Sequence, residues 1–482
     1  MALDAGTTGV RALSFAPNGT PVDTAYRELA QHYPAPGRVE HDAAEIAALA
    51  GEVLSEVAAA MAARGDSALA LGLTNQRETT VALDRASGRP TAPAIVWQDR
   101  RTADECARLV AAGAEPRVRE VTGLVLDPYF SATKMRWLLD ADALDGAREP
   151  ALATVDAWLL YWLTGGVEGG SLLTEPSNAS RTSLLDLATR EWSPEMATLF
   201  GVDLSLLPEV VASDGLFGLV AASACPALAG TPITGVLGDQ QAALFGQGCL
   251  SPGQAKVTYG TGSFVMMNVG AAMPPPAPGL LTTVAWDTDA PTYALEGSAF
   301  VAGAVVQWLR DELGLFAHSA DLEPLAAHSS DGVAVVPAFT GLGSPFWRAD
   351  ARGAILGLSR ASGLPQIARA TIEALAFQVR AMTDAFAAAG HPAVELRADG
   401  GAAAMDTLLE LQATTSRSPV LRSATLEATA RGAALMAGLG VGLYRDEVEV
   451  AALFAADRRF DPGEGALLEP LYDAWLRAVE RV

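Results

Sequence analysis

Two similar segments, each a strand followed by a tight Gly/Thr turn and a second strand, constrain the fold of this chain most strongly. Residues 4–11 carry one copy at the start of the chain, and residues 256–270 carry the other just past its middle. The first copy leads to Pro17-Asn18-Gly19, and Asn-Gly between extended segments is a strong hairpin signal. The simplest account is two related α/β domains, each beginning with a Gly-Thr hairpin, that face one another across a cleft.

The length supports two domains, because 482 residues exceed what one hydrophobic core usually holds. Apolar strands alternate with amphipathic segments, which implies α/β layering. We expect strands at 68–74, 94–97 and 333–338, and helices at 150–163, 297–315, 365–389 and 424–439. The loop-like stretch 246–252 suggests an N-terminal domain at 1–246 and a C-terminal domain at 247–482. Only Ala2 and Leu3 precede Asp4 in the first strand, so we expect that strand to be weakened.

Composition excludes several classes of function. A net charge of −23 disfavours nucleic acid and anionic membranes as partners. The three cysteines are too few and too scattered for a disulfide framework or a zinc site. The N-terminus lacks the basic and apolar regions of a signal peptide, and we see no uninterrupted apolar stretch long enough to span a bilayer. We therefore expect a cytoplasmic protein without membrane insertion.

Familiar catalytic motifs are absent from the sequence. It contains no Gly-x4-Gly-Lys-Ser/Thr, no strand-turn-helix Gly-x-Gly-x-x-Gly, no Gly-x-Ser-x-Gly and no His-Glu-x-x-His. The five histidines do not cluster at metal-ligand spacing. P-loop, dinucleotide-binding, serine hydrolase and zinc protease chemistry are therefore not indicated.

The Gly-Thr turns suit phosphate, because glycine allows close backbone approach and hydroxyls donate to phosphate oxygens. One such turn is usually a plain hairpin, but two, each heading a domain, favour a nucleotide held between lobes. Asp4 lies at the end of the first strand, where a carboxylate could hold Mg²⁺ through water.

Asp239 is the second isolated acid, between an apolar strand and a helix of small residues. An ordinary N-cap is the simplest interpretation of an aspartate there. Beside Gln240, however, it could act as the general base for a substrate hydroxyl, since phosphoryl transfer needs mainly positioning and charge neutralisation.

A third cluster suits a polyol. Arg77 can donate hydrogen bonds to hydroxyl groups and Glu78 can accept them. An adjacent Arg and Glu are more often an inconsequential surface pair. Trp97 and Tyr129 add aromatic faces nearby in the sequence.

Together these segments resemble the FGGY family of carbohydrate kinases, and within it the members that phosphorylate glycerol. The resemblance covers almost the whole chain and is most specific at residues 74–80, 96–102 and 238–247; residues 129–137 and 357–373 resemble the two family signatures, and 177–182 and 337–339 also match. It implies an α/β fold of two actin-like (ribonuclease H-like) domains flanking a central cleft. It also implies ATP and Mg as cofactors, glycerol as acceptor, and a homo-oligomer, either a dimer or a tetramer.

The resemblance assigns a role to each candidate residue. Asp239 would be the catalytic base and would share Mg with Asp4. The polyol would contact Arg77, Glu78, Trp97, Tyr129, Asp239, Gln240 and Phe264. The nucleotide and its phosphates would contact Thr7, Thr8, Gly9, Arg11, Gly260, Thr261, Gly303, Gln307, Gly400, Gly401 and Met405.

The nucleotide half departs from the family pattern. Ala5 and Gly9 stand where the glycerol-phosphorylating members usually have Gln and Ser. Met405 stands where they usually have Asn, and a methionine can pack against adenine but cannot donate an amide hydrogen bond. Residues 225–232 contain no basic side chain, whereas relatives inhibited by fructose 1,6-bisphosphate carry an Arg there, so we expect no such inhibition.

Two other functions remain open at this point. The chain could phosphorylate a different short polyol or keto-polyol, such as dihydroxyacetone or erythritol. It could also be a non-catalytic actin-like sensor that binds polyol or nucleotide, although Asp4 and Asp239 disfavour that alternative.

Overall fold

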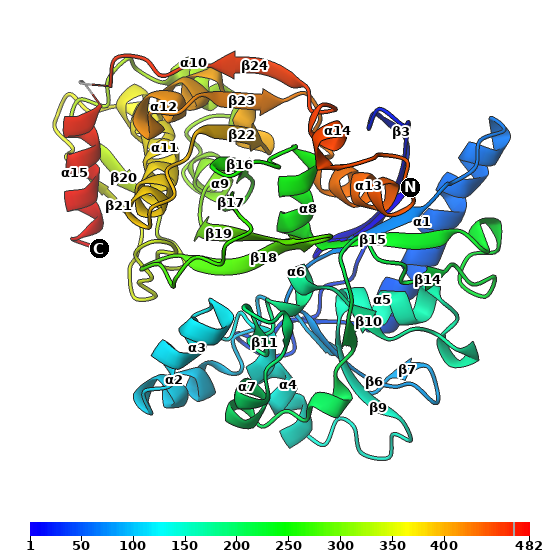
Figure 1. Cartoon of the computed structure of the whole chain (residues 1–482). Coiled ribbons are helices and arrows are strands. Elements are labelled where there is room, and N and C mark those ends of the chain that lie inside the picture. Colours follow the sequence, from blue (N-terminus) through cyan, green and yellow to red (C-terminus); the bar gives the residue numbers. More distant parts are fainter. Residues whose placement is uncertain (466–467) are drawn as a thin grey trace.

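The computed structural model describes residues 1–465 and 468–482 and shows two lobes, each built on a mixed β-sheet (Figure 1). The first sheet has the strand order β14-β15-β5-β1-β2-β3, and the second has the order β18-β19-β17-β16-β22-β23-β24. The mixed α/β architecture with two facing lobes is the one that the paired hairpins predicted.

The first sheet starts as an antiparallel meander and continues with parallel strands. β1 (Ala2–Ala5), β2 (Gly9–Phe15) and β3 (Pro21–Glu28) form the meander. β5 (Leu71–Asn75) and β15 (Pro232–Gly238) then add in parallel beyond β1. Although β1 has only four residues, each of them pairs with a neighbour on both sides, so this buried strand forms at the centre of the sheet.

The second sheet repeats this topology. β16 (Gln254–Tyr259), β17 (Ser263–Gly270) and β19 (Pro291–Ala299) form its meander. β22 (Glu395–Asp399) and β23 (Val420–Ser423) add in parallel beyond β16, and β18 (Leu281–Asp287) and β24 (Ala456–Phe460) extend the two edges. The same strand order in both lobes supports the prediction of two related domains.

Two helices cross between the lobes. α8 (Asp239–Gly246) follows β15, and α13 (Ala428–Gly440) packs on both α8 and the first sheet (Figure 1). A Cβ atom on Gly432 would lie 1.8 Å from the carbonyl oxygen of Ala242, and one on Gly246 would lie 2.0 Å from that of Ala428. Glycine at these positions therefore permits the close crossing that joins the lobes.

A smaller sheet extends the first lobe. It contains β4 (Glu40–His41), β8 (Ala94–Ile95), β6 (Thr80–Asp84), β7 (Arg89–Pro90) and β9 (Pro150–Thr154). α2 (Ala103–Ala111), α3 (Glu115–Thr122) and α4 (Ser131–Asp140) accompany it. The loops of this extension carry Trp97 and Tyr129.

Two predicted helices are wrong in part. Residues 150–154 form strand β9, and only α5 (Val155–Leu163) is helical, because a continuous apolar run suits a buried strand as well as a helix. Residues 297–299 end strand β19, and the helix is α9 (Gly303–Asp311). The other predictions agree with β5, β8, β20 (Ala334–Val336), α11 (Leu364–Ala388) and α13.

Shorter elements complete the described chain. They are η1 (Gly166–Glu168), β10 (Leu173–Thr174), α6 (Pro176–Ala179), β11 (Leu185–Asp186), β12 (Glu191–Trp192), α7 (Pro194–Phe200), η2 (Leu204–Leu206), β13 (Glu209–Val210), β14 (Gly218–Leu219), η3 (Pro226–Leu228), η4 (Ser319–Asp321), α10 (Leu322–Leu325), β21 (Ala354–Leu356), η5 (Gly401–Ala404), α12 (Asp406–Ser416), α14 (Glu447–Ala451) and α15 (Glu469–Val479).

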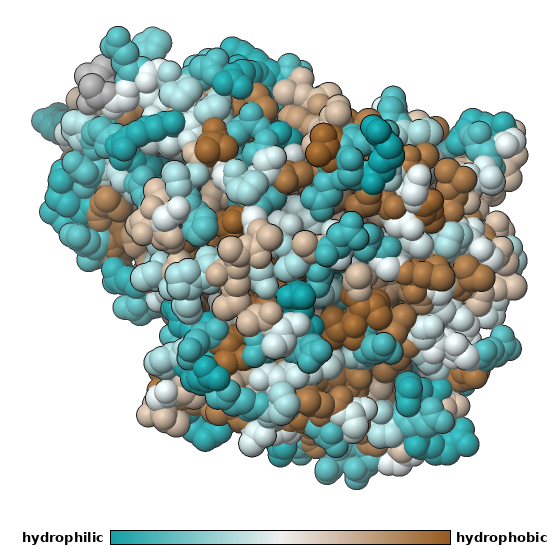
Figure 2. All heavy atoms as spheres, viewed as in Figure 1, coloured by the Kyte–Doolittle hydropathy of each residue, from teal (hydrophilic) through white to brown (hydrophobic). Residues whose placement is uncertain are grey.

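Helix α1 (Ala43–Ala63) is long and apolar enough to cross a membrane by length and composition alone, contrary to the expectation that no segment would be. Its buried residues, among them Ile46, Val53 and Val57, belong to the core of the first lobe, and the helix packs on β2 and β3. Core helices of globular domains pass the same length and hydropathy test. On the face drawn in Figure 2, hydrophobic residues are interspersed with hydrophilic ones.

Candidate active site

The two Gly-Thr turns each close a hairpin. In the first, the amide of Gly6 donates to the carbonyl of Gly9, and the hydroxyl oxygen of Thr7 accepts from the indole nitrogen of Trp97 at 2.9 Å. Thr8 is exposed at the turn. The side-chain amides of Gln31 and Gln76 donate hydrogen bonds to backbone carbonyls of this turn. The predicted phosphate residues of this hairpin therefore share one turn, and one of them contacts the predicted polyol residue Trp97.

The second hairpin joins the start of helix α9. The amide of Gly303 donates to the carbonyl of Gly260 at 2.8 Å, and that of Ala302 donates to Thr261 at 2.7 Å. A Cβ atom on Gly303 would lie 2.6 Å from the Gly260 carbonyl oxygen, so this contact needs glycine. Gln307 is exposed on α9.

The end of β22 lies against the same hairpin. Gly400 has φ +87°, and a Cβ atom there would lie 2.5 Å from the carbonyl oxygen of Tyr259, whereas one on Gly401 would meet open space. Met405, by contrast, is buried in the core of the second lobe. The hairpin turn and the two glycines thus come together, and Met405 lies beneath the surface rather than on it.

Asp4 and Arg11 are cross-strand neighbours on β1 and β2. Arg11 donates to Asp4 at 2.8 Å and to Glu427, just before helix α13, at 2.5 Å. Burial raises the pKa of Asp4 above its usual range; Arg11 opposes that rise, and the negative charge of Asp239 adds to it. Asp4 and Asp239 are therefore close enough to influence one another, as two carboxylates that share a metal ion would be.

Arg77 lies at the centre of the predicted polyol residues. Its Nε is 3.1 Å from Asp239 Oδ1, and its Nη2 donates to the hydroxyl of Tyr129 at 3.4 Å. Asp239 is not the N-cap of α8, because Gly238 occupies that position and Asp239 is the first helical residue; its side chain is 31% exposed. The predicted base is thus accessible, and it is oriented by a buried guanidinium.

Glu78 has φ +63°, in the left-handed region that costs a non-glycine residue conformational energy. Its carbonyl accepts a hydrogen bond from the hydroxyl of Ser131, and its carboxylate accepts one from Arg181 Nε at 2.6 Å. Burial raises the pKa of Glu78, against the opposing effect of Arg77 and Arg181. This strained position holds one carboxylate oxygen on Arg181 and leaves the other without a hydrogen bond among the described residues.

Sequence reasoning assigned no role to two members of this cluster, Arg181 and Glu296. Glu296, on β19 of the second lobe, accepts from Arg77 at 2.7 Å and from Arg181 at 3.1 Å. Burial alone would raise the pKa of Glu296, but Arg181 and Arg77 outweigh it and lower the pKa to about 2. The sequence signal that could have identified Glu296 is its position as the single acid in the apolar strand 291–299.

Aromatic side chains border this charged cluster. The rings of Trp97 and Tyr129 meet edge to face with centroids 5.6 Å apart. Arg181 lies over the ring of Tyr129 at 5.6 Å. Phe264, on β17, is half-buried and pairs in register with Thr258 and Ser298. Charged groups flanked by aromatic faces suit a small molecule with hydroxyl groups on a carbon chain.

The two predicted carboxylates fit the ligand chemistry of Mg²⁺, which prefers oxygen and is usually bound by one or two carboxylates plus water and phosphate. Among residues 1–465 and 468–482, no group of three His, Cys, Asp or Glu side chains forms a protein-only metal cage. Asp4 and Asp239 would hold such an ion together with the phosphates of the nucleotide.

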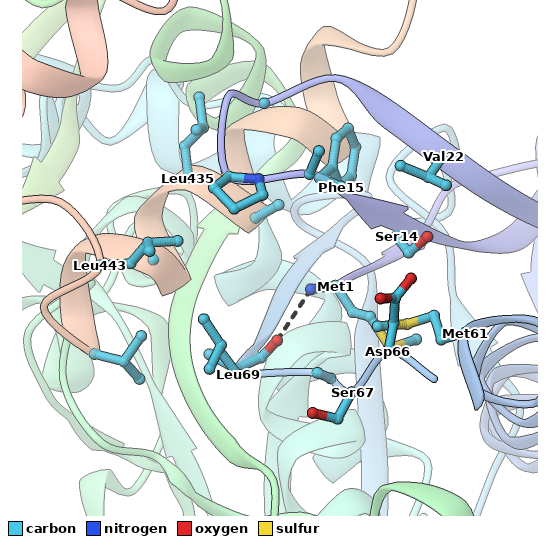
Figure 3. Close-up of a pocket in the computed structure, with 18 of the residues that line it drawn as sticks. Met1, Ser14, Phe15, Val22, Met61, Asp66, Ser67, Leu69, Leu435 and Leu443 are labelled. Atoms are coloured by element: carbon cyan, nitrogen blue, oxygen red, sulfur yellow. Dashed lines mark hydrogen bonds between the residues drawn. The ribbon is translucent and has the colours of Figure 1, made fainter. Parts of the chain in front are cut away.

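A cavity of about 360 Å³ lies elsewhere, lined by Met1 just before β1, the end of β2, the end of α1 and part of α13 (Figure 3). There the amino group of Met1 donates to the carbonyl of Ala70 at 3.0 Å, and burial lowers its pKa to about 6. Phe15, Leu435 and Leu443 line other walls. None of the predicted site residues borders this cavity, so we assign it no binding role.

Two lobes with repeated topology, a Gly-Thr hairpin in each, and a charged, aromatic-lined cluster around an accessible aspartate define a phosphotransferase of the actin-like type. Comparison with known proteins makes the assignment more specific. The model of the FGGY carbohydrate kinase N-terminal domain matches residues 1–246, and that of the C-terminal domain matches residues 255–441. The chain belongs to the FGGY family of carbohydrate kinases.

Individual relatives cover the chain from end to end. It is 48% identical to the glycerol kinase of Aromatoleum aromaticum over all of this chain and 98% of that protein. It is 49% identical to the glycerol kinase of Gloeobacter violaceus, over all of this chain and 96% of the relative. The crystal structure of Plasmodium falciparum glycerol kinase with ADP is similar at a TM-score of 0.92 and 32% identity, covering 99% of this chain and 97% of that one.

Proposed function

We propose that this protein is a glycerol kinase, which transfers the γ-phosphoryl group of ATP to a primary hydroxyl of glycerol and yields sn-glycerol 3-phosphate. Full-length relatives at 48–49% identity support the activity. The observation that carries the mechanism is the contact of Arg77 with Asp239, Glu296 and Tyr129. Arg77 thus links the accessible carboxylate of Asp239 to a buried acid and to the hydroxyl of Tyr129.

The residues divide the work by charge. Arg77 and Gln240 donate to the hydroxyl oxygens, Glu78 and Asp239 accept from hydroxyl hydrogens, and Trp97 and Phe264 pack against the carbon chain. Asp239 takes the proton of the attacking substrate hydroxyl while the oxygen of that hydroxyl bonds to the γ-phosphorus. The bond from that phosphorus to the β–γ bridging oxygen breaks, and ADP leaves.

The nucleotide would lie across the two hairpins. The backbone and hydroxyls of residues 7–9 and 260–261 would hold the phosphates, with Arg11 nearby. Gly303, Gln307, Gly400 and Gly401 would line the adenosine side, with Met405 beneath them. Asp4 and Asp239 would hold Mg²⁺, which would neutralise part of the phosphate charge when bound.

A coupled assay of ADP release with ATP, Mg²⁺ and glycerol tests this function. We expect glycerol-dependent release, and GTP run in parallel measures the base selectivity that Met405 leaves open. Asp239→Asn should retain glycerol binding by calorimetry while kcat falls at least about 100-fold. Asp203→Asn is the control, because this exposed helix cap tolerates asparagine equally well. Glycerol binding without release from either donor would favour the sensor alternative.

The substrate range and surroundings are further parts of the proposal. Turnover with dihydroxyacetone and erythritol beside glycerol separates a glycerol kinase from a kinase of another short polyol. We further propose a cytoplasmic homo-oligomer, a dimer or a tetramer, with no nucleic-acid partner and no membrane insertion. The net charge of −23 supports the last two points.

A further inference from the structure

Lysine is almost absent from this chain. Of its 33 basic residues only two, Lys134 and Lys256, are lysines, and the rest are arginines. Both lysines are fully buried, and both contact residues of the predicted polyol site. The composition thus supplies arginine wherever a surface cation is placed and keeps lysine for two interior positions beside the site.

Each lysine is held by neutral oxygens. Lys134, in the first turn of α4, donates to the carbonyls of Tyr129 at 2.5 Å and Pro128 at 3.3 Å. Lys256, on β16, donates to the side-chain oxygen of Gln240 and to the hydroxyl of Thr258 at 3.1 Å. In the part of the chain that the structure describes, neither ammonium forms an ion pair within 4 Å. A buried cation without a paired carboxylate is costly, so these positions need an explanation other than stability.

The contact of Lys256 with Gln240 has a specific consequence. An ammonium group has three donors and no acceptor, so the amide oxygen of Gln240 must face Lys256. The amide nitrogen then points away from Lys256, and within residues 1–465 and 468–482 it makes no hydrogen bond. Gln240 is thereby available to the polyol as a donor only. A planar guanidinium is larger and binds in a fork, so arginine would not reproduce this contact.

The charge of Lys256 also fits its surroundings. Arg77 and Arg181 carry two positive charges against the three acids Glu78, Glu296 and Asp239, which leaves this cluster with one net negative charge. Burial lowers the pKa of Lys256, and Asp399 and Asp239 are the two carboxylates whose charges most oppose this shift and favour the ammonium form. Asp399 lies beside Thr258 in the register of β16 and β22. Lys256 therefore joins the first turn of α8 to the sheet of the opposite lobe.

We propose that Lys256 is a positioning residue of the polyol site, which fixes Gln240 as a hydrogen-bond donor to one hydroxyl of the acceptor. The proposal rests on the proposed function. It predicts that Lys256 affects the recognition of one acceptor hydroxyl, whose oxygen accepts a hydrogen bond. It predicts no effect of Lys256 on binding of the nucleotide or its phosphates.

Kinetics of Lys256→Met with glycerol, 1,2-propanediol and 1,3-propanediol test the proposal. Losing one oriented hydrogen bond should raise the KM for glycerol about tenfold and leave the KM for ATP within about twofold. For the diol that lacks the hydroxyl contacted by Gln240, kcat/KM should change little, so the preference for glycerol falls. Gln240→Leu should lower the preference equally, and the double variant should lower it no further. Proportional losses on all three substrates, or an additive double variant, would overturn the proposal.

A second measurement does not depend on turnover or on the folding of Lys256→Met. Protein labelled with ¹⁵N-lysine contains two side-chain amine sites, and Lys134→Met or Lys256→Met, whichever folds, assigns their NMR signals. In Asp239→Asn, glycerol alone should shift the Lys256 signal as Gln240 engages the polyol. Glycerol binding with an unmoved Lys256 signal would overturn this inference alone. Failure of wild-type protein to bind glycerol would overturn the proposed function as well.

Discussion

Replacing Glu296 by glutamine should destabilise the protein and weaken glycerol binding together. Glu296 is 1% exposed and is the acid shared by Arg77 and Arg181, so Glu296→Gln keeps the shape and removes the charge. The fall of its pKa from 4.5 to about 2 corresponds to about 3 kcal/mol in favour of the folded state. Breaking one side of a buried ion pair independently suggests about 3–5 kcal/mol.

Urea unfolding followed by tryptophan fluorescence at neutral pH measures the loss, and calorimetry with glycerol measures binding. Because the pKa of Glu296 is lowered, its contribution is fully present above pH 4.5 and disappears as the pH falls towards 2. The difference in unfolding free energy between wild type and Glu296→Gln should therefore disappear in acid. Glu120→Gln, whose partner Arg117 lies on the surface, is the matched control and should leave the unfolding midpoint unchanged. A loss of less than about 1 kcal/mol with unchanged glycerol affinity would refute the shared-acid role of Glu296.

Three further perturbations follow from the fold. Gly432→Ala should lower the free energy of unfolding by about 1–3 kcal/mol and should also lower kcat. Its Cβ atom would lie 1.8 Å from the carbonyl oxygen of Ala242, on the helix that begins with Asp239. A variant with the stability and kcat of the wild type would contradict this prediction. His41 has a pKa lowered to about 4 by burial and by His32, so stability should fall by up to about 3 kcal/mol between pH 6.5 and 4; His41→Gln, unfolded with urea over the same range, should abolish that slope. The lobes should close when glycerol and a non-hydrolysable ATP analogue bind together, and small-angle scattering should record a smaller radius of gyration; identical profiles would count against closure.

The sequence predicted the architecture because its strongest signals are local. The Gly-Thr turns and Asn18-Gly19 specify hairpins within a few residues, and the same signal recurs at Gly260 in the second lobe. Residues 150–154 were misassigned because burial on both faces removes the alternation that distinguishes a strand from a helix.

The site was only partly predictable for the opposite reason. Arg77 and Glu78 stand out as adjacent charges at a strand end, but their partners Arg181 and Glu296 are about one hundred to more than two hundred residues away. Such contacts across lobes leave no periodic trace in a single sequence. Lys256, by contrast, stands out in the composition, because lysine occurs only twice in the chain.

The most direct test of the account is identification of the product. Protein incubated with ATP, Mg²⁺ and glycerol should yield sn-glycerol 3-phosphate as a single enantiomer, detected by ³¹P NMR and by an enantiospecific dehydrogenase. Asp239→Asn should yield almost none under the same conditions. Inorganic phosphate as the only new product, or equal product from wild type and Asp239→Asn, would contradict the assignment of this site to glycerol phosphorylation.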